Sequence, residues 1–97
     1  MKNILANINK AFESRVRLGI MSVLMVNEHA DFISLRDTLE VTDGNLASHL
    51  RALEEYGYIV AEKKFINRKP NTSYRITREG EESFRDHIKA LEDLIGK

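Results

Sequence analysis

The apolar residues of this chain are spaced for helices up to Gly57 and for strands directly after it. The leucines within residues 46–53 recur at intervals of four and three, and Gly57 suits the left-handed position that ends a helix. Residues 58–66 and 72–77 are instead rich in Ile, Val, Phe, Tyr and Thr, and residues 67–71 lie between them. This composition predicts two strands joined by a five-residue basic loop. The chain is therefore restricted to a mainly α structure with a small β-hairpin.

Five helices are predicted from the same spacing and from residues that can cap a helix. Ser14, Thr42 and Thr77 have side chains that can accept a hydrogen bond from the first turn of a helix, and Ser34 begins a pattern similar to a capping box. A short extended link, Phe32–Ile33, is expected before Ser34. The predicted fold class is thus α+β. The elements follow in the order helix, helix, short strand, helix, helix, strand, strand, helix. The helices are expected over residues 3–10, 14–26, 34–40, 42–57 and 77 onward.

The length and composition of the chain limit the classes of protein that it can belong to. At 97 residues it has room for one domain, since chains divide beyond roughly 250 residues. It has no cysteine, which excludes disulfides, thiolate metal sites and a cysteine nucleophile. The apolar run at residues 18–26 is much shorter than the ~20 residues of a membrane span, and the N-terminus does not resemble a signal peptide. We expect a single domain, residues 1–97, in a soluble cytoplasmic protein without a membrane partner.

The charges of the chain cancel in sum but are separated along the sequence. Fifteen basic and fifteen acidic residues give no net charge, whereas residues 63–78 contain six cations and no acid. Because binding to a polyanion depends on local Lys and Arg density, this segment is a candidate nucleic-acid contact. The alternative is an ordinary solvated hairpin, on which basic residues also accumulate. The candidate contacts to the DNA backbone are Lys63, Lys64, Arg68, Lys69, Arg75 and, from the preceding helix, Arg51.

One face of the helix over residues 42–57 is small and polar. With the leucines buried, a rotation of about 100° per residue leaves this face directed away from the core. Short polar side chains fit the major groove of DNA, which is about 12 Å wide, whereas long apolar ones would obstruct entry. The alternative is an ordinary solvated helix face. The residues predicted to approach and read the bases are Gly44, Asn45, Ser48 and His49.

Three segments of the sequence resemble those of a known family. Residues 41–58, with the sequence VTDGNLASHLRALEEYGY, resemble the recognition-helix region of small winged helix-turn-helix transcriptional regulators of bacteria and archaea, related to the MarR and ArsR types. Residues 74–80, YRITREG, resemble the end of their wing and the start of their last helix, and residues 15–20, RVRLGI, the start of their first core helix. The resemblance extends over about residues 14–84. It implies a winged-helix fold in which the basic hairpin is the wing and the preceding helix binds double-stranded DNA.

The two ends of the chain have more apolar side chains than so small a core needs. Two chains could bury this surplus together, and the resemblance implies homodimers paired through helical elements at residues 1–12 and 79–97. The two recognition helices would then meet successive major grooves about 34 Å apart, on an inverted repeat. Alternatively, these side chains complete the core of the monomer. The predicted dimerisation residues are Ile4, Leu5, Ile8, Phe84, Ile88, Leu91, Leu94 and Ile95.

Other chemistry has little support in the sequence. His29, His49 and His87 are scattered, and no cluster has the spacing of a zinc site, although metal sensing is known among ArsR-type relatives. Asp86 and His87 are adjacent and are expected to form a surface pair on the last helix. The chain has no glycine-rich phosphate loop and no nucleophile signature. We therefore expect no cofactor, no metal and no enzymatic activity, and the sequence identifies no small-molecule effector.

Together these patterns predict a homodimeric, sequence-specific regulator of transcription that binds double-stranded DNA and acts by occupying a promoter. The resemblance implies a repressor, since repression is the commoner mode among similar proteins, and the sequence itself does not distinguish repression from activation. The alternative is a winged-helix module that docks onto another protein through the same helix or hairpin, because a fold does not dictate its function. The acid-free segment at residues 63–78 favours DNA, whereas the zero net charge of the chain favours the protein-docking alternative.

Overall fold

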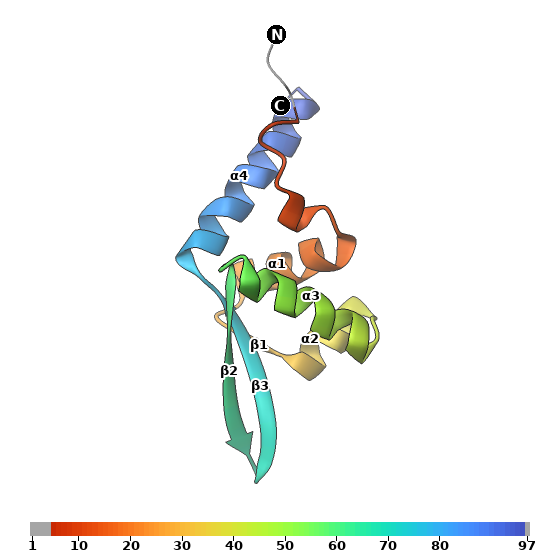
Figure 1. The fold of residues 1–97 in the computed structure, drawn as a ribbon, viewed down its shortest axis with the longest axis vertical. Helices are drawn as coiled ribbons and strands as arrows, with labels where there is room; N and C mark the ends of the chain where they lie inside the picture. Colours follow the sequence, from red (N-terminus) through yellow and green to blue (C-terminus); the bar gives the residue numbers. More distant parts are fainter. Residues whose placement is uncertain (1–4, 97) are drawn as a thin grey trace.

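The structure, a computed structural model, describes residues 5–96 and contains four α-helices and a three-stranded antiparallel sheet within them (Figure 1). The predicted α+β class is confirmed, as is the order of the elements from residue 14 onward. The strands lie in the order β1-β3-β2. In chain order the elements are the 3-10 helix η1 (Lys10–Phe12), α1 (Arg15–Val26), β1 (Ala30–Asp31), α2 (Phe32–Leu39), α3 (Asp43–Glu55), β2 (Ile59–Ile66), β3 (Lys69–Ile76) and α4 (Arg78–Leu94).

The helix predicted for residues 3–10 is not present in its described part. Residues 5–7 form a turn, and the only helical segment before α1 in the described chain is η1. The side chain of Asn9 accepts a hydrogen bond from the backbone N–H of Ala11 at 2.9 Å and so caps a new short turn. Asparagine competes with the helical backbone in this way, which explains why apolar spacing alone was misleading.

Helix α2 begins three residues earlier than the predicted cap at Ser34 implies. Asp31, not Ser34, is the N-cap, since its carboxylate accepts a 2.7 Å hydrogen bond from the backbone N–H of Ser34. This bond lowers the pKa of Asp31. The expected extended link is shifted to β1, where Ala30 and Asp31 pair with β3. The N-caps predicted at Ser14, Thr42 and Thr77 are all confirmed.

The hairpin has a tighter turn than predicted. Asn67 and Arg68 alone connect the strands, with φ angles of 53° and 65°, so both adopt the left-handed conformation of a two-residue hairpin turn. The five-residue loop prediction is therefore wrong, and Lys69 and Pro70 belong to β3. Pro70 pairs with Phe65 in a part of β3 that lies beyond β1, where one edge of the strand is unpaired and a missing N–H costs little.

Helix α1 lies at the centre of the core, as its almost continuous apolar sequence predicts. It contacts η1, α2, α3 and β3. Burial of apolar side chains from every element around α1 is the main favourable contribution to this fold. None of the helices in the described part of the chain has the length and apolar character needed to cross a membrane. The buried cluster consists of Ala11, Phe12, Ile20, Met21, Leu24, Leu35, Leu46, Leu50, Leu53, Ile59, Tyr74 and Phe84.

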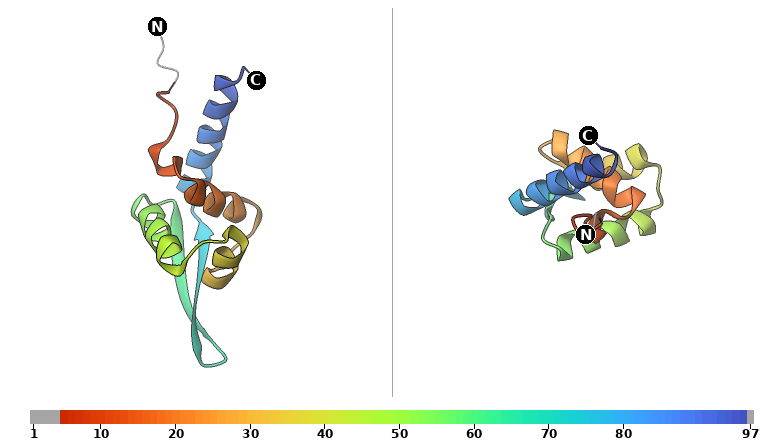
Figure 2. Two further views of the ribbon diagram at one scale, coloured as in Figure 1. Left: turned by 90° about the vertical axis from the view of Figure 1, so that its right-hand side faces the viewer. Right: turned by 90° about the horizontal axis from the view of Figure 1, so that it is seen from above.

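Helix α4 is attached at its start to the beginning of the hairpin. The backbone N–H of Thr77 donates to the carbonyl of Tyr58 at 2.9 Å, and its hydroxyl donates to the carbonyl of Gly57 at 2.7 Å. A Cβ atom at Gly80 would lie 2.1 Å from the Tyr58 carbonyl oxygen, so the close approach requires glycine. From this junction α4 projects away from the body at the end opposite to the hairpin tip (Figures 1 and 2).

His87 of α4 is buried at 3% exposure and is not on the surface as predicted. Its Nδ1 atom accepts a 3.1 Å hydrogen bond from the backbone N–H of Asn9, and its ring lies 5.3 Å from that of Phe12. The buried residues of α4 are Gly80, Phe84, His87 and Ala90, because the contact at Gly80 turns this face toward the body. His87 thus connects α4 to the N-terminal segment, and burial lowers its pKa.

We expect the free energy of unfolding to decrease as the pH falls below 6.5, the ordinary pKa of histidine, because the unfolded chain then binds a proton that buried His87 does not. Urea unfolding at pH 7.5 and pH 5 measures this change. The variant His87→Gln should lose part of the pH dependence. Equal pH dependence in His87→Gln and the wild type would contradict this role for His87.

Candidate nucleic-acid interface

Three of the four predicted base-reading residues lie exposed on the outer face of α3. The face opposite to them is fixed in the core, since Leu46, Leu50 and Leu53 are each at most 2% exposed. The helix starts where the Thr42 hydroxyl accepts a hydrogen bond from the Asn45 backbone N–H at 3.2 Å. The outer face therefore consists of short or small groups and contains Gly44, Asn45 and Ser48, with Arg51 exposed further along the helix.

His49 is placed differently, half-buried on the side of α3 that faces α1. Its Nδ1 atom accepts a 3.0 Å hydrogen bond from Nε of Arg17, and Arg17 also donates to the carbonyl of Ala11 at 3.5 Å. Burial and, to a lesser extent, the charge of Arg17 lower the pKa of His49. Because Nδ1 is an acceptor here, the proton of the neutral ring is on Nε2. Arg17 thus sets the tautomer of His49, a role that the sequence analysis missed.

A second arginine fixes the other side of α3. Arg36 of α2 contacts Asp43 of α3 and its own neighbour Asp37, at 3.1 Å in each case. Arg36 donates both hydrogen bonds, and they raise its pKa, with the bond to Asp43 having the larger effect. The turn between α2 and α3 includes Glu40 in the left-handed conformation, with φ 53°. The two helices of the predicted helix-turn-helix are therefore held together at the end of α3 that begins the candidate interface.

The hairpin contains exposed cations that the rest of the described chain does not neutralise. Between residues 59 and 76 there are five cations and one acid, which gives a net charge of +4. The acid, Glu62, is paired with Arg75 at 3.1 Å, so Arg75 is a weaker candidate for phosphate contact than the sequence suggested. Within residues 5–96, no ion pair involves the other four cations of the hairpin, Lys63, Lys64, Arg68 and Lys69.

The hairpin lies beside α3 and extends beyond the helices. Its strands pass α2 and α3 and protrude from the body, as both Figure 1 and the left view of Figure 2 show. Helix α3 contacts β2, and the pKa of Tyr74 in β3 is raised mainly by burial and in part by Glu54 of α3. The exposed face of α3 and the cationic hairpin are therefore neighbouring parts of one surface.

The predicted dimerisation residues divide into several groups. Phe84 is only 5% exposed and packs against Phe12, with ring centroids 5.2 Å apart, so it belongs to the core of the protomer. Ile8 is half-buried, and Ile4 lies outside the described residues. The others are exposed: Leu5 (62%), Ile88 (38%), Leu91 (37%), Leu94 (38%) and Ile95 (71%).

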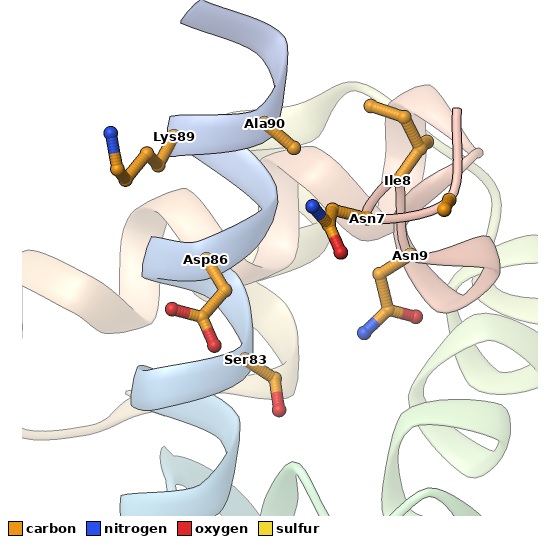
Figure 3. A pocket seen from close by; sticks show the side chains of 8 residues that line it. Asn7, Ile8, Asn9, Ser83, Asp86, Lys89 and Ala90 are labelled. Atoms are coloured by element: carbon orange, nitrogen blue, oxygen red, sulfur yellow. The ribbon is translucent and has the colours of Figure 1, made fainter. Parts of the chain in front are cut away.

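Two open grooves flank α4. One, of about 490 Å³, lies between α1 and α4 and is lined by apolar Met25, Phe84 and Ile88 and by polar Ser22, Arg85 and Glu92. The other, of about 530 Å³, lies between the N-terminal segment and α4, where Asn7 and Asn9 lie across from Ser83 and Asp86 (Figure 3). Within residues 5–96, no three His, Asp or Glu side chains come close enough to hold a metal ion.

The family of the chain follows from a comparison over most of its length. A family model described as a winged helix DNA-binding domain matches residues 16–95. The chain belongs to this winged-helix family. The predicted resemblance to winged-helix regulators is thereby confirmed. We call the hairpin, residues 59–76, the wing. The family is one of DNA-binding regulators and not of enzymes.

Individual winged-helix relatives agree with this assignment. An uncharacterized protein of Methanocaldococcus jannaschii is 38% identical over 85 residues, which cover 88% of this chain and 92% of that protein. A transcriptional regulator homologue from Pyrococcus horikoshii has a similar structure, with a TM-score of 0.85, 34% identity and coverage of 95% and 89% of the two chains. MarR has a TM-score of 0.75 and 25% identity, with 95% of this chain and 69% of that chain covered. The chain is thus homologous to transcriptional regulators.

We expect the variant Arg17→Gln to raise the pKa of His49 toward its ordinary value, because the positive charge next to the ring is removed. NMR titration of the imidazole signals measures this change directly. The pKa of His87, which is lowered by burial and does not depend on Arg17, provides an internal control and should be the same in both proteins. A His49 pKa that is the same in both proteins would exclude an electrostatic effect of Arg17.

Proposed function

We propose that this winged-helix protein is a sequence-specific regulator of transcription that binds an inverted-repeat operator as a homodimer. Helix α3 enters the major groove, and the wing contacts the phosphate backbone and the adjacent minor groove. Promoter occupancy makes it a repressor. The observation that carries this proposal is the outer face of α3, polar and exposed, directly beside a wing with four cations that no acid of residues 5–96 neutralises.

Gly44 supports the placement of α3 in a groove. Glycine within a helix costs about 0.5 to 1 kcal/mol relative to alanine, so a reason for its presence is needed. A Cβ atom at Gly44 would have no atom of the protein within 4 Å, and the fold itself therefore does not require glycine there. Close approach of a DNA strand gives a reason for glycine, because without a side chain at this position the backbone of the first turn of α3 can reach the edge of the groove.

The neighbouring side chains supply hydrogen-bonding groups for reading bases. Asn45 can pair with adenine through two hydrogen bonds, and Ser48 can donate or accept at either kind of base pair. His49, held by Arg17 with its proton on Nε2, would offer a donor at the inner side of the helix. Arg51 lies on the same exposed surface and would contact a phosphate, as would the cations of the wing.

Dimerisation is proposed to occur through the exposed apolar side chains of α4 and the N-terminal segment. Four large apolar side chains at residues 88–95 are at least 37% exposed. The described N-terminal segment before η1, which includes exposed Leu5, lies near the same end of the molecule (Figure 2). A second copy that covers these side chains would remove them from water, which is favourable by about 25 cal/mol per Å² of apolar surface. A two-fold axis at this end would direct both recognition helices and both wings toward one duplex.

Replacing both Arg68 and Lys69 with alanine should weaken binding to a mixed-sequence duplex about tenfold or more. In a dimer four phosphate contacts are lost, so the slope of log affinity against log salt concentration should fall by roughly 3 to 4. Fluorescence anisotropy titrations between 50 and 200 mM salt measure both quantities. A matched pair of cations outside the wing, Lys10→Ala with Lys89→Ala, should change neither. Unchanged binding by the wing variant would refute the wing assignment and favour the protein-docking alternative.

Sedimentation equilibrium at micromolar concentration should give twice the 11.2 kDa mass of the chain. Leu91→Asp should shift the protein to the monomer, with a dissociation constant at least ~100-fold higher, because a charge in an apolar interface is not compensated. Val26→Asp, at a residue 82% exposed on α1, is the matched control and should remain dimeric. A wild-type protein that sediments only as an 11.2 kDa species would show that the proposed dimer does not form.

A further inference from the structure

The tip of the wing exposes two large apolar side chains that the proposed phosphate contacts do not explain. Phe65 is 78% exposed and Ile66 is 51% exposed. Every residue from 61 to 70 is exposed, so this part of the hairpin has no contact with the core that would cover either side chain. Large apolar groups concentrated at a protruding tip indicate a contact with another molecule.

The strand register places the two side chains on opposite faces of the wing. Successive side chains of a strand alternate, and the cross-strand partners are Pro70 for Phe65 and Lys69 for Ile66. On the face of Phe65, the residues nearer the body are Lys63, Ala61 and then buried Ile59. Phe65 therefore lies on the face that packs on the helices at its base, whereas Ile66 lies on the other face.

The tip is also held in a fixed geometry. Eight consecutive residue pairs connect β2 and β3 without a bulge, from Ile59 with Ile76 to Ile66 with Lys69. The two-residue turn that follows has both of its residues in the left-handed conformation. A tight turn on a regular ladder leaves the tip little freedom, so Phe65 is preorganised to enter a partner rather than to adapt to its surface.

The charges around Phe65 favour DNA as the partner. Lys63, Lys64, Arg68 and Lys69 surround the tip, and within residues 5–96 none of them forms an ion pair. A protein or a second copy of this chain would have to supply matching acids at the same place as an apolar pocket. The minor groove of DNA offers negative charges and an apolar site together, since phosphates line its walls and stacked base pairs form an apolar interior.

We propose that Phe65 acts as a wedge that inserts at a base-pair step of the minor groove and kinks the operator. This inference rests on the proposed function and adds DNA deformation to it. Apolar side chains that enter the minor groove unstack a base step and bend the duplex by roughly 20 to 90° toward the major groove. Lys63, on the same face, holds the flanking phosphate. Steps of the TA type deform most easily, so the wing selects a flexible step without hydrogen bonds to its bases.

The test uses two 30-base-pair duplexes with dyes at both ends, one with TA steps at the wing positions and one with stiff A-tracts there. At saturation, the wild type should increase energy transfer between the ends of the TA duplex and bind it about tenfold more tightly than the A-tract duplex. Phe65→Ser should abolish both the bend and the preference, with less than about a threefold change in A-tract affinity because every cation is retained. Since Phe65 is 78% exposed, the fold tolerates this change.

Two matched variants make the result specific to Phe65. Ile66→Ser, on the opposite face of the wing, and Val26→Ser, at an exposed apolar residue of α1, should both bend the TA duplex as the wild type does. Equal energy transfer with Phe65→Ser and wild type, or binding without any bend, overturns the wedge and leaves DNA binding intact. In that case the apolar tip is available to a protein partner. A wild type that binds neither duplex overturns the proposed function together with the wedge.

Discussion

The burial of three leucines of α3 is the constraint on which the rest of the interface depends. Leu46, Leu50 and Leu53 fill the space beside α1, and their complete burial fixes the rotation of the helix about its axis. Once that rotation is set, the side of the helix opposite to the leucines faces outward, and no further interaction is needed to expose Gly44, Asn45 and Ser48. The ion pair of Arg36 with Asp43 and the hydrogen bond of Arg17 with His49 then fix the two sides of the same helix.

Much of the fold was predictable because it is encoded locally. Ser14, Thr42 and Thr77 cap helices as their side chains predict, and Gly57, at φ 80°, follows the end of α3. The outward face of α3 was also predictable, because it depends only on which positions are apolar. The exposed cations of the wing follow from the sequence in the same way, since a run of charged residues has no apolar surface to bury.

The errors arise where distant parts of the chain decide between local options. Both Asp31 and Ser34 can cap α2, and the pairing of Asp31 with β3 selects the first. His87 was expected on the surface beside Asp86, but the close contact of Gly80 with Tyr58 fixes the rotation of α4, and His87 is buried. The roles of Arg17 and Arg36 were missed for the same reason. Arg17 belongs to α1 and Arg36 to α2, but both contact residues of α3. The two-residue turn at Asn67 and Arg68 was not predicted, because neither residue is the glycine that usually marks a left-handed turn position.

The separation of charge between the two ends of the molecule affects how it meets a duplex. The wing carries +4 at one end, and α4, with six acids and three cations, carries −3 at the other. A neutral molecule with this distribution is not pulled strongly toward a polyanion, but it experiences a torque in the field of the phosphates. It therefore arrives with the wing leading and the acidic helix trailing. Rotational search during the encounter is shortened even though the long-range attraction is weak.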